Sequence, residues 1–199
     1  MGSRSEELMK IVPIPHNLEL GVSTLPRSPG LHMSQIYGDL YQDLEPKRFV
    51  RGGTPDINKM EAGLGLESVL EEGLKGRLAE RPGEFVTDEG IIYSPDLIIF
   101  NDVTRLGEIK LTWLSCREVP REPGNSLPQK MDKWLTQMKA YCYHLQTPYA
   151  RLYAFFVNGT YKHPYTPELL AWDIEFSTQE LKENWQMLLN HARHKGMLS

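Results

Sequence analysis

The chain has 199 residues, of which 40% are hydrophobic, so it is long enough for one domain with a substantial buried core. No apolar run approaches the length of a membrane span and the polar N-terminus has no signal-peptide pattern, so we expect a cytoplasmic protein without a membrane partner. Two cysteines, Cys116 and Cys142, are too few for a four-cysteine iron–sulfur cluster.

The formal net charge of −4 is distributed unevenly along the chain. Residues 105–151 contain eight Lys/Arg and four Asp/Glu, so this segment nets +4 and the remainder of the chain nets −8. A basic segment of this kind fits a nucleic-acid partner, and it is equally typical of a solvated helix face and loop. Both interpretations stay open at the level of composition.

The N-terminal third predicts an irregular arm followed by helices. Residues 1–30 are rich in Pro, Gly and Ser, which favours irregular structure. A short helix is expected over residues 34–44, because Ser34 resembles a cap and apolar residues recur at helical spacing. A second helix is expected over about residues 60–79. Its predicted buried face consists of Leu66, Val69, Leu70, Leu74 and Leu78.

Residues 90–113 are the stretch around which the remaining elements are arranged. After a short strand near residues 84–87, they predict two apolar strands joined by a turn at Asn101-Asp102, with Tyr93 in the first strand. Charged residues interrupt both strands, namely Asp96, Glu108 and Lys110. A buried charge is costly unless it is paired or binds a metal, so these three residues need a chemical reason.

The spacing of the three charges suggests such a reason. Side chains two apart in a strand share a face, so Glu108 and Lys110 project together, and a hairpin can bring Asp96 beside Glu108. Two carboxylates in one site favour a divalent cation between them. A lysine beside that cation can orient a metal-bound water and help to deprotonate it. This is the machinery of metal-assisted phosphodiester hydrolysis.

The C-terminal half predicts further alternating elements. After a polar loop we expect a helix, a strand, a second strand and a final helix, over about residues 128–145, 149–157 and 166–176 and from Ser177 onward. Asn158-Gly159 is a hairpin turn signal, and Ser177 and Glu180 have the spacing of a capping box. The expected order is therefore helix–β–β–β–helix–β–β–helix. It forms one domain, with residues 1–55 as an arm and short helix packed on a core of residues 56–199.

The central charges also carry a family resemblance. Pro95-Asp96 followed by Glu108-Ile109-Lys110 resembles the signature of the PD-(D/E)XK nuclease superfamily. Further Glu-x-Lys and Pro-Asp copies occur at residues 45–47, 180–182 and 55–56, but none has the required strand setting.

Two flanking elements strengthen this resemblance. The run from Gly63 to Glu67 resembles the Gly-x-x-x-Glu element that precedes the sheet in this superfamily. Gln137 and Tyr141 match the Gln-x-x-x-Tyr element of its RecB-like and lambda-exonuclease-like branch, and their spacing places them on one helix face. The resemblance spans roughly residues 60–160.

The resemblance implies a restriction-endonuclease-like α/β core with a mixed central β-sheet and helices on both faces. It implies a deoxyribonuclease that depends on Mg²⁺ or Mn²⁺ and has DNA as its partner. The favoured interpretation is an exonuclease that acts on DNA ends in recombination or repair. The setting would be a bacterial or phage-infected cell. A non-catalytic DNA-binding module, a structure-selective endonuclease, a homo-oligomer and a single-strand annealing or recombination partner all stay open.

The resemblance also implies roles for individual residues. The implied metal ligands are Asp96, Glu108, the Ile109 carbonyl and Glu67. Lys110 would position the nucleophilic water, while Gln137 and Tyr141 would orient Lys110 or hold the scissile strand. Candidate phosphate contacts are Arg27, His32, Ser34, Arg117 and Arg121. For these five residues the alternatives are a packed N-terminal arm with surface polar groups and a mobile surface loop.

Overall fold

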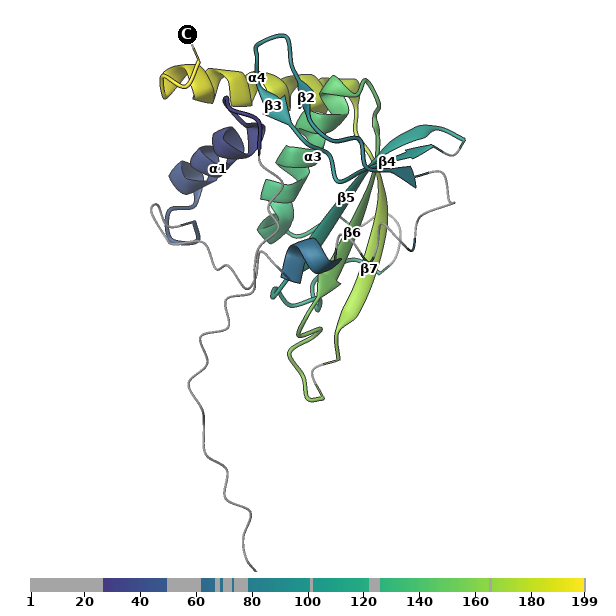
Figure 1. The fold of residues 1–199 in the computed structure, drawn as a ribbon. Helices are drawn as coiled ribbons and strands as arrows, with labels where there is room; N and C mark the ends of the chain where they lie inside the picture. Colours follow the sequence, from purple (N-terminus) through teal and green to yellow (C-terminus); the bar gives the residue numbers. More distant parts are fainter. Residues whose placement is uncertain are drawn as a thin grey trace, which may run out of the picture.

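The computed structural model describes residues 27–49, 62–66, 69, 73, 79–100, 102–121, 126–164 and 166–198. Its centre is a five-stranded mixed sheet with the order β1-β4-β5-β6-β7 (Figure 1). These strands are β1 (Ala79–Glu80), β4 (Leu97–Phe100), β5 (Thr104–Thr112), β6 (Tyr149–Phe156) and β7 (Glu168–Glu175). All neighbouring pairs are antiparallel except β5 and β6, which are parallel. The mixed α/β class predicted from the sequence is confirmed.

The parallel pairing of β5 and β6 requires a long crossover, because parallel strands cannot be joined by a tight turn. The crossover contains a short 3₁₀ helix, η1 (Gln129–Met131), and the helix α3 (Asp132–His144). Alternate residues of β6 are buried, and α3 contacts both β5 and β6. The face of β5 that carries Glu108 and Lys110 is therefore the face beneath α3, since Glu108 lies beside Leu152 and Lys110 beside Ala154.

Two further helices complete the layer around α3. They are α1 (Met33–Leu44) and α4 (Thr178–His194), and each packs on α3 and on the other (Figure 1). The main core joins them to the sheet through residues such as Ile36 of α1, Met138 of α3 and Trp185 of α4. The capping box predicted for α4 is present, because the Ser177 hydroxyl accepts from the Glu180 N–H and Glu180 Oε2 accepts from the Ser177 N–H. Among the described residues, no helix is long and apolar enough to cross a membrane.

Some predicted boundaries in the N-terminal half are wrong. Tyr93 does not extend the central strand: it belongs to β3 (Ile92–Tyr93), which pairs with β2 (Phe85–Val86) in a separate two-stranded sheet. Pro95 lies between β3 and β4 and has no N–H to donate to a ladder, which explains the interruption. Ala79 lies in β1 rather than at the end of a helix. The residue preceding α1 as its cap is His32, not Ser34.

The predicted helix over residues 60–79 lies mostly outside the described residues. Within it, residues 62–66 are helical. Val69, predicted to be buried, is 69% exposed. Glu67 lies outside the described residues, as do Leu70, Leu74 and Leu78.

The predicted polar loop after β5 is less open than its composition indicates. Cys116 and Val119 are buried and form a second core cluster with Met131 and Phe156. The indole of Trp172 in β7 donates to the carbonyl of Pro120, which ties this loop to the sheet. Turn signals at Asn158-Gly159 are confirmed, although the connection between β6 and β7 extends over residues 157–167.

Candidate active site

Glu108 is the most deeply buried of the predicted site residues, with no exposed surface. Its Oε1 atom accepts a hydrogen bond from Gln137 Nε2 of α3 at 2.6 Å. The ammonium group of Lys110, two residues further along β5, forms an ion pair with the same oxygen. A buried carboxylate needs such partners, so β5 and α3 together explain how this charge is accommodated in the core.

Asp96 reaches the same region from the start of β4. The antiparallel register pairs Leu97 with Gly107, so the preceding residue, Asp96, lies alongside the next residues of β5. Its Oδ2 atom accepts a hydrogen bond from the backbone N–H of Ile109 at 2.8 Å. The predicted hairpin pairing of these two strands is confirmed.

Gly107 permits the close approach of the two strands. A Cβ atom at this position would lie 2.8 Å from Leu97 Cβ and 3.3 Å from the side chain of Ile99, which is closer than side chains pack. The absence of a side chain therefore allows β4 to lie against β5 immediately before Glu108. The sequence analysis did not single out this glycine.

Lys110 is held in its charged form by its neighbours. Burial by itself lowers the pKa of a lysine, but the carboxylates of Glu108 and Asp96 favour the ammonium more strongly, so the net pKa is raised. Lys110 therefore carries a positive charge in this arrangement, and its ammonium can donate hydrogen bonds. It is not a ready proton acceptor at neutral pH while both carboxylates are ionised beside it.

Gln137 and Tyr141 both face this cluster from α3. Gln137 is buried and bonds to Glu108, as described above. Tyr141 is also buried, and burial raises its pKa well above the usual range, so the phenol stays protonated. Its ring packs 5.5 Å from the ring of Tyr93. The i and i+4 spacing on one helix face therefore places both side chains on the sheet side of α3.

Tyr37 of α1 also belongs to this neighbourhood. Burial raises the pKa of Tyr37 to about 12, with further effects from the charges of Lys110, Glu108 and Asp96. Tyr37 is not among the residues predicted for this site from the sequence. Its spacing within the apolar face of α1 makes it indistinguishable from an ordinary core aromatic residue until the helix is placed against β5.

The donor set fits a hard divalent cation. Carboxylate and carbonyl oxygens are the ligands that Mg²⁺ and Mn²⁺ prefer, and Asp96, Glu108 and the Ile109 carbonyl supply them from adjacent strands. Burial of Glu108 in a protein core is costly for a carboxylate and is compatible with a second positive charge.

The predicted phosphate contacts fall into two groups. Arg27 Nη1 lies 3.5 Å from Ser34 Oγ, and the charge of Arg27 is one of those that act on the pKa of Tyr37. His32 instead contacts the Ser28 carbonyl at 2.8 Å, while its backbone N–H donates to Gln35 at the start of α1.

The second group of predicted phosphate contacts lies in the loop after β5, where the structure does not bring it to the cluster. Arg121 is bonded through both of its terminal nitrogens to Glu168 at the start of β7. Arg117 is exposed on the same loop. Cys116 lies beneath them and donates to Glu168 at 3.3 Å.

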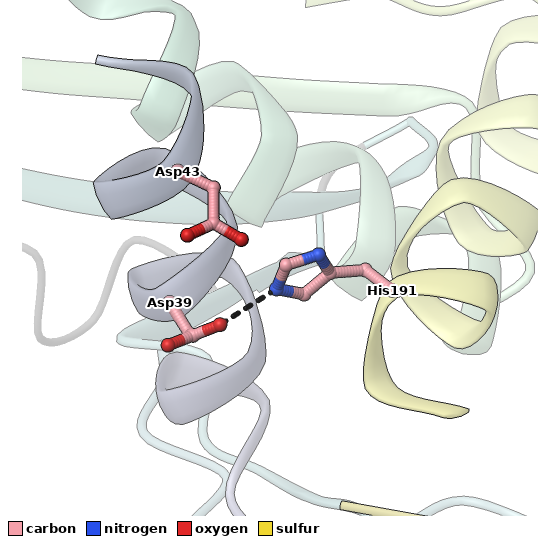
Figure 2. Close-up of side chains that lie close together, drawn as sticks. All are labelled: Asp39, Asp43 and His191. Atoms are coloured by element: carbon pink, nitrogen blue, oxygen red, sulfur yellow. Dashed lines mark hydrogen bonds and ion pairs between the residues drawn. The ribbon is translucent and has the colours of Figure 1, made fainter. Parts of the chain in front are cut away.

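A separate group of possible metal ligands joins α1 to α4. The side chains of Asp39, Asp43 and His191 point toward one another, with His191 Nε2 2.9 Å from Asp39 Oδ2 (Figure 2). Lys195 lies in the same group, 2.7 Å from Asp43 and 3.7 Å from Asp39. Because an ammonium group already balances these carboxylates, we read the group as an ion-pair network between two helices. His191 and Lys195 thus connect the end of α4 to α1.

No protein-family model matches this sequence, and no curated protein matches it with significance. Among solved structures, the fold is similar to that of SSO0001, with a TM-score of 0.51 and 15% identity over 86% of this chain and 79% of that chain. Similar structures also include the LHK-Exo complex with dAMP, with a TM-score of 0.47, 13% identity and coverage of 83% and 89%. The alkaline exonuclease LHK-Exo from Laribacter hongkongensis gives a TM-score of 0.42 and 15% identity over the same shares. The similarity to SSO0001 concerns the fold.

Proposed function

We propose that this protein is a DNA nuclease that depends on Mg²⁺ or Mn²⁺ and acts on DNA ends. The observation that carries the proposal is the buried carboxylate of Glu108, which shares one oxygen with Lys110 and Gln137 while Asp96 lies on the neighbouring strand. Two carboxylates, a charged lysine and an amide donor on rigid strands and a helix form a constellation suited to phosphodiester hydrolysis.

In this proposal, Asp96 and Glu108 hold the metal with the Ile109 carbonyl, and Glu67 supplies a further carboxylate. The metal would polarise the phosphodiester and lower the pKa of a bound water. Lys110 directs its ammonium toward the water or the phosphate oxygens, because its raised pKa keeps it protonated. Gln137 fixes the orientation of Glu108, and Tyr141 supports the same helix face from within the core.

The substrate would approach from the side of α1. Arg27 and Ser34 are in contact with each other and border Tyr37, which makes them the better-placed phosphate contacts of the predicted set. Arg121 is engaged by Glu168, so a role in binding DNA would require this ion pair to open. His32 and Arg117 contribute at most to the edges of such a surface.

A DNA-binding module that does not cleave is the second candidate, and one observation favours it. The ion pair between Lys110 and Glu108 already neutralises the buried carboxylate without a metal. Titration of the protein with Mn²⁺ by calorimetry separates the two functions, because a nuclease requires the ion and a binding module does not.

The first functional experiment compares linear DNA with covalently closed circular DNA, using the wild type and Lys110→Ala in Mg²⁺, Mn²⁺ or EDTA. We expect metal-dependent loss of linear DNA alone, and none with the variant. Cutting of the circle would assign an endonuclease instead. Equal activity of Lys110→Ala and the wild type would show that this cluster does not catalyse the cleavage. Inactivity of the wild type with both metals would favour the binding module.

A further inference from the structure

The basic segment over residues 105–151 is largely neutralised in the folded chain. Six of its eight Lys/Arg side chains form ion pairs with described acidic residues. These six are Arg105, Lys110, Arg121, Lys130, Lys139 and Arg151. Among described partners, Arg117 and Lys133 form no ion pair, and of these two only Lys133 is partly buried.

Lys133 occupies an unusual environment for a cation. Its Nζ atom lies 4.6 Å from the ring centroid of Phe49 and 5.8 Å from that of Tyr37. Burial is the main effect that lowers its pKa, and among the described residues the cations Lys110 and Arg48 lower it further. A partly buried ammonium with two cations nearby and no described carboxylate partner is poorly compensated, apart from the faces of two aromatic rings.

Arg48 does not share this deficit. Arg48 forms an ion pair with Glu45 at 3.2 Å and donates to the Lys130 carbonyl. Its Cζ atom also lies 5.0 Å from the ring centroid of Phe49. The uncompensated charge in this region is therefore that of Lys133. It projects from the first turn of α3, four residues before Gln137, and thus from the helix face that meets Glu108.

Tyr37 connects Lys133 with the active-site cluster. Its ring contacts Lys133, while its hydroxyl is subject to the charges of Lys110, Glu108 and Asp96. A tyrosine hydroxyl is protonated at neutral pH, so that of Tyr37 can donate a hydrogen bond to an anion.

We propose that Lys133 and Tyr37 form a binding position for a backbone phosphate of nucleic acid, next to the Asp96–Glu108–Lys110 cluster. The inference rests on the proposed function and specifies where the substrate backbone lies. A phosphate diester supplies the negative charge that Lys133 lacks and accepts the hydroxyl proton of Tyr37. The occupant would be a phosphate adjacent to the one that is cleaved, since Lys110 and the carboxylates serve the scissile group.

The experiment measures binding of a short blunt-ended DNA duplex in EDTA over a range of salt concentrations. Lys133→Met keeps the aliphatic stem on the two rings and removes the charge, so the slope of log K against log salt should fall by about 0.9, the value for one phosphate contact. Tyr37→Phe removes no charge, so affinity should fall while the slope is kept. Lys133→Arg should restore the slope. Lys182→Met, an exposed lysine of α4, is the matched control and should change neither quantity.

The outcomes separate this inference from the proposed function. A wild type that binds and cleaves DNA, with an unchanged slope in Lys133→Met, would overturn the phosphate position and leave the nuclease in place. In that case Lys133 only joins α3 to Tyr37 of α1 and to Phe49 beyond that helix through cation–π contacts, and the variant shows a lower Tm alone. A wild type that binds no DNA would overturn both. Should Lys133→Met fold poorly, Tyr37→Phe decides the matter, because unchanged affinity in this isosteric variant contradicts the proposal.

Discussion

Glu108 is a completely buried carboxylate, and two neighbouring side chains reduce the free-energy cost of burying its charge. Gln137 supplies a hydrogen bond and Lys110 an ion pair, so the charge is tolerated where an isolated carboxylate would not be. Lys110 itself keeps 21% of its side chain exposed. If Glu108 and Lys110 served the chemistry alone, alanine at either position would abolish cleavage and leave the melting temperature nearly unchanged. The complete burial of Glu108 leads us to expect a cost in stability as well.

We therefore predict that Glu108→Gln and Lys110→Met each destabilise the protein, by up to about 3 kcal/mol, because each leaves one buried partner uncompensated. The double variant should lose less than the sum of the two single losses, because both charges are then removed together. Urea unfolding of the four proteins gives the coupling free energy directly. Strictly additive losses would show that the ion pair contributes nothing to stability.

At the scale of elements, the site depends on how closely β4 and β5 approach each other. Asp96 belongs to neither helix nor ladder, and its hydrogen bond to the Ile109 N–H exists because the register brings the start of β4 beside β5. Gly107 allows this approach, since any side chain would collide with Leu97. The strand pair, rather than a flexible loop, thus sets the distance between the two carboxylates.

Gly107→Ala should accordingly displace β4 and lower stability by about 1–3 kcal/mol, the usual cost of overpacking. It should also weaken Mn²⁺ binding, because Asp96 moves with β4. Gly38→Ala in α1 is the matched control: its Cβ meets nothing within 4 Å, and alanine in a helix is expected to stabilise by roughly 0.5–1 kcal/mol. Thermal unfolding and Mn²⁺ calorimetry measure both effects. Normal Mn²⁺ affinity in Gly107→Ala would show that metal binding does not depend on the spacing of β4 and β5.

At the scale of the whole molecule, α1 carries Tyr37 and Ser34, and the segment before it carries Arg27, toward a site that is built mainly from β4, β5 and α3. The helix is held there by its apolar face and by the network of Asp39, Asp43, His191 and Lys195 with α4 (Figure 2). A buried hydrogen bond between the hydroxyls of Tyr41 and Thr136 adds a direct contact with α3. The position of the proposed substrate contacts therefore depends on helix packing far from the chemistry.

Asp39→Asn is expected to loosen this attachment and to lower stability by about 1 kcal/mol, at the upper end of the range for partly exposed ion pairs. Amide hydrogen exchange should rise across α1 and stay unchanged in β5 and β6, since the sheet core does not use this network. The matched control is Asp173→Asn, which breaks the ion pair with Arg151 on the sheet and should leave α1 unaffected. Equal amide exchange rates across α1 in Asp39→Asn and in the wild type would show that apolar packing alone holds this helix.

Much of the architecture is encoded in local patterns. The apolar runs of β5 and β6, the turn at Asn158-Gly159 and the capping box at Ser177 predict elements that are present, because each depends on residues close together in sequence. The same reasoning placed Asp96 alongside β5, since a hairpin between neighbouring strands leaves few alternative registers. Where it was wrong, as for Tyr93 and Ala79, a separate small sheet or a short edge strand competed for the segment.

The sequence by itself determined the α/β class and the residues of the central cluster, because strand and helix periodicity specify which side chains share a face. Only the tertiary structure decided that Lys133 lies near Tyr37 and that Arg121 is bonded to Glu168. It also decided that β5 needs a glycine where it faces β4. These facts depend on contacts between segments remote in sequence, whose distances and charges arise only when α1, α3 and the sheet are packed together.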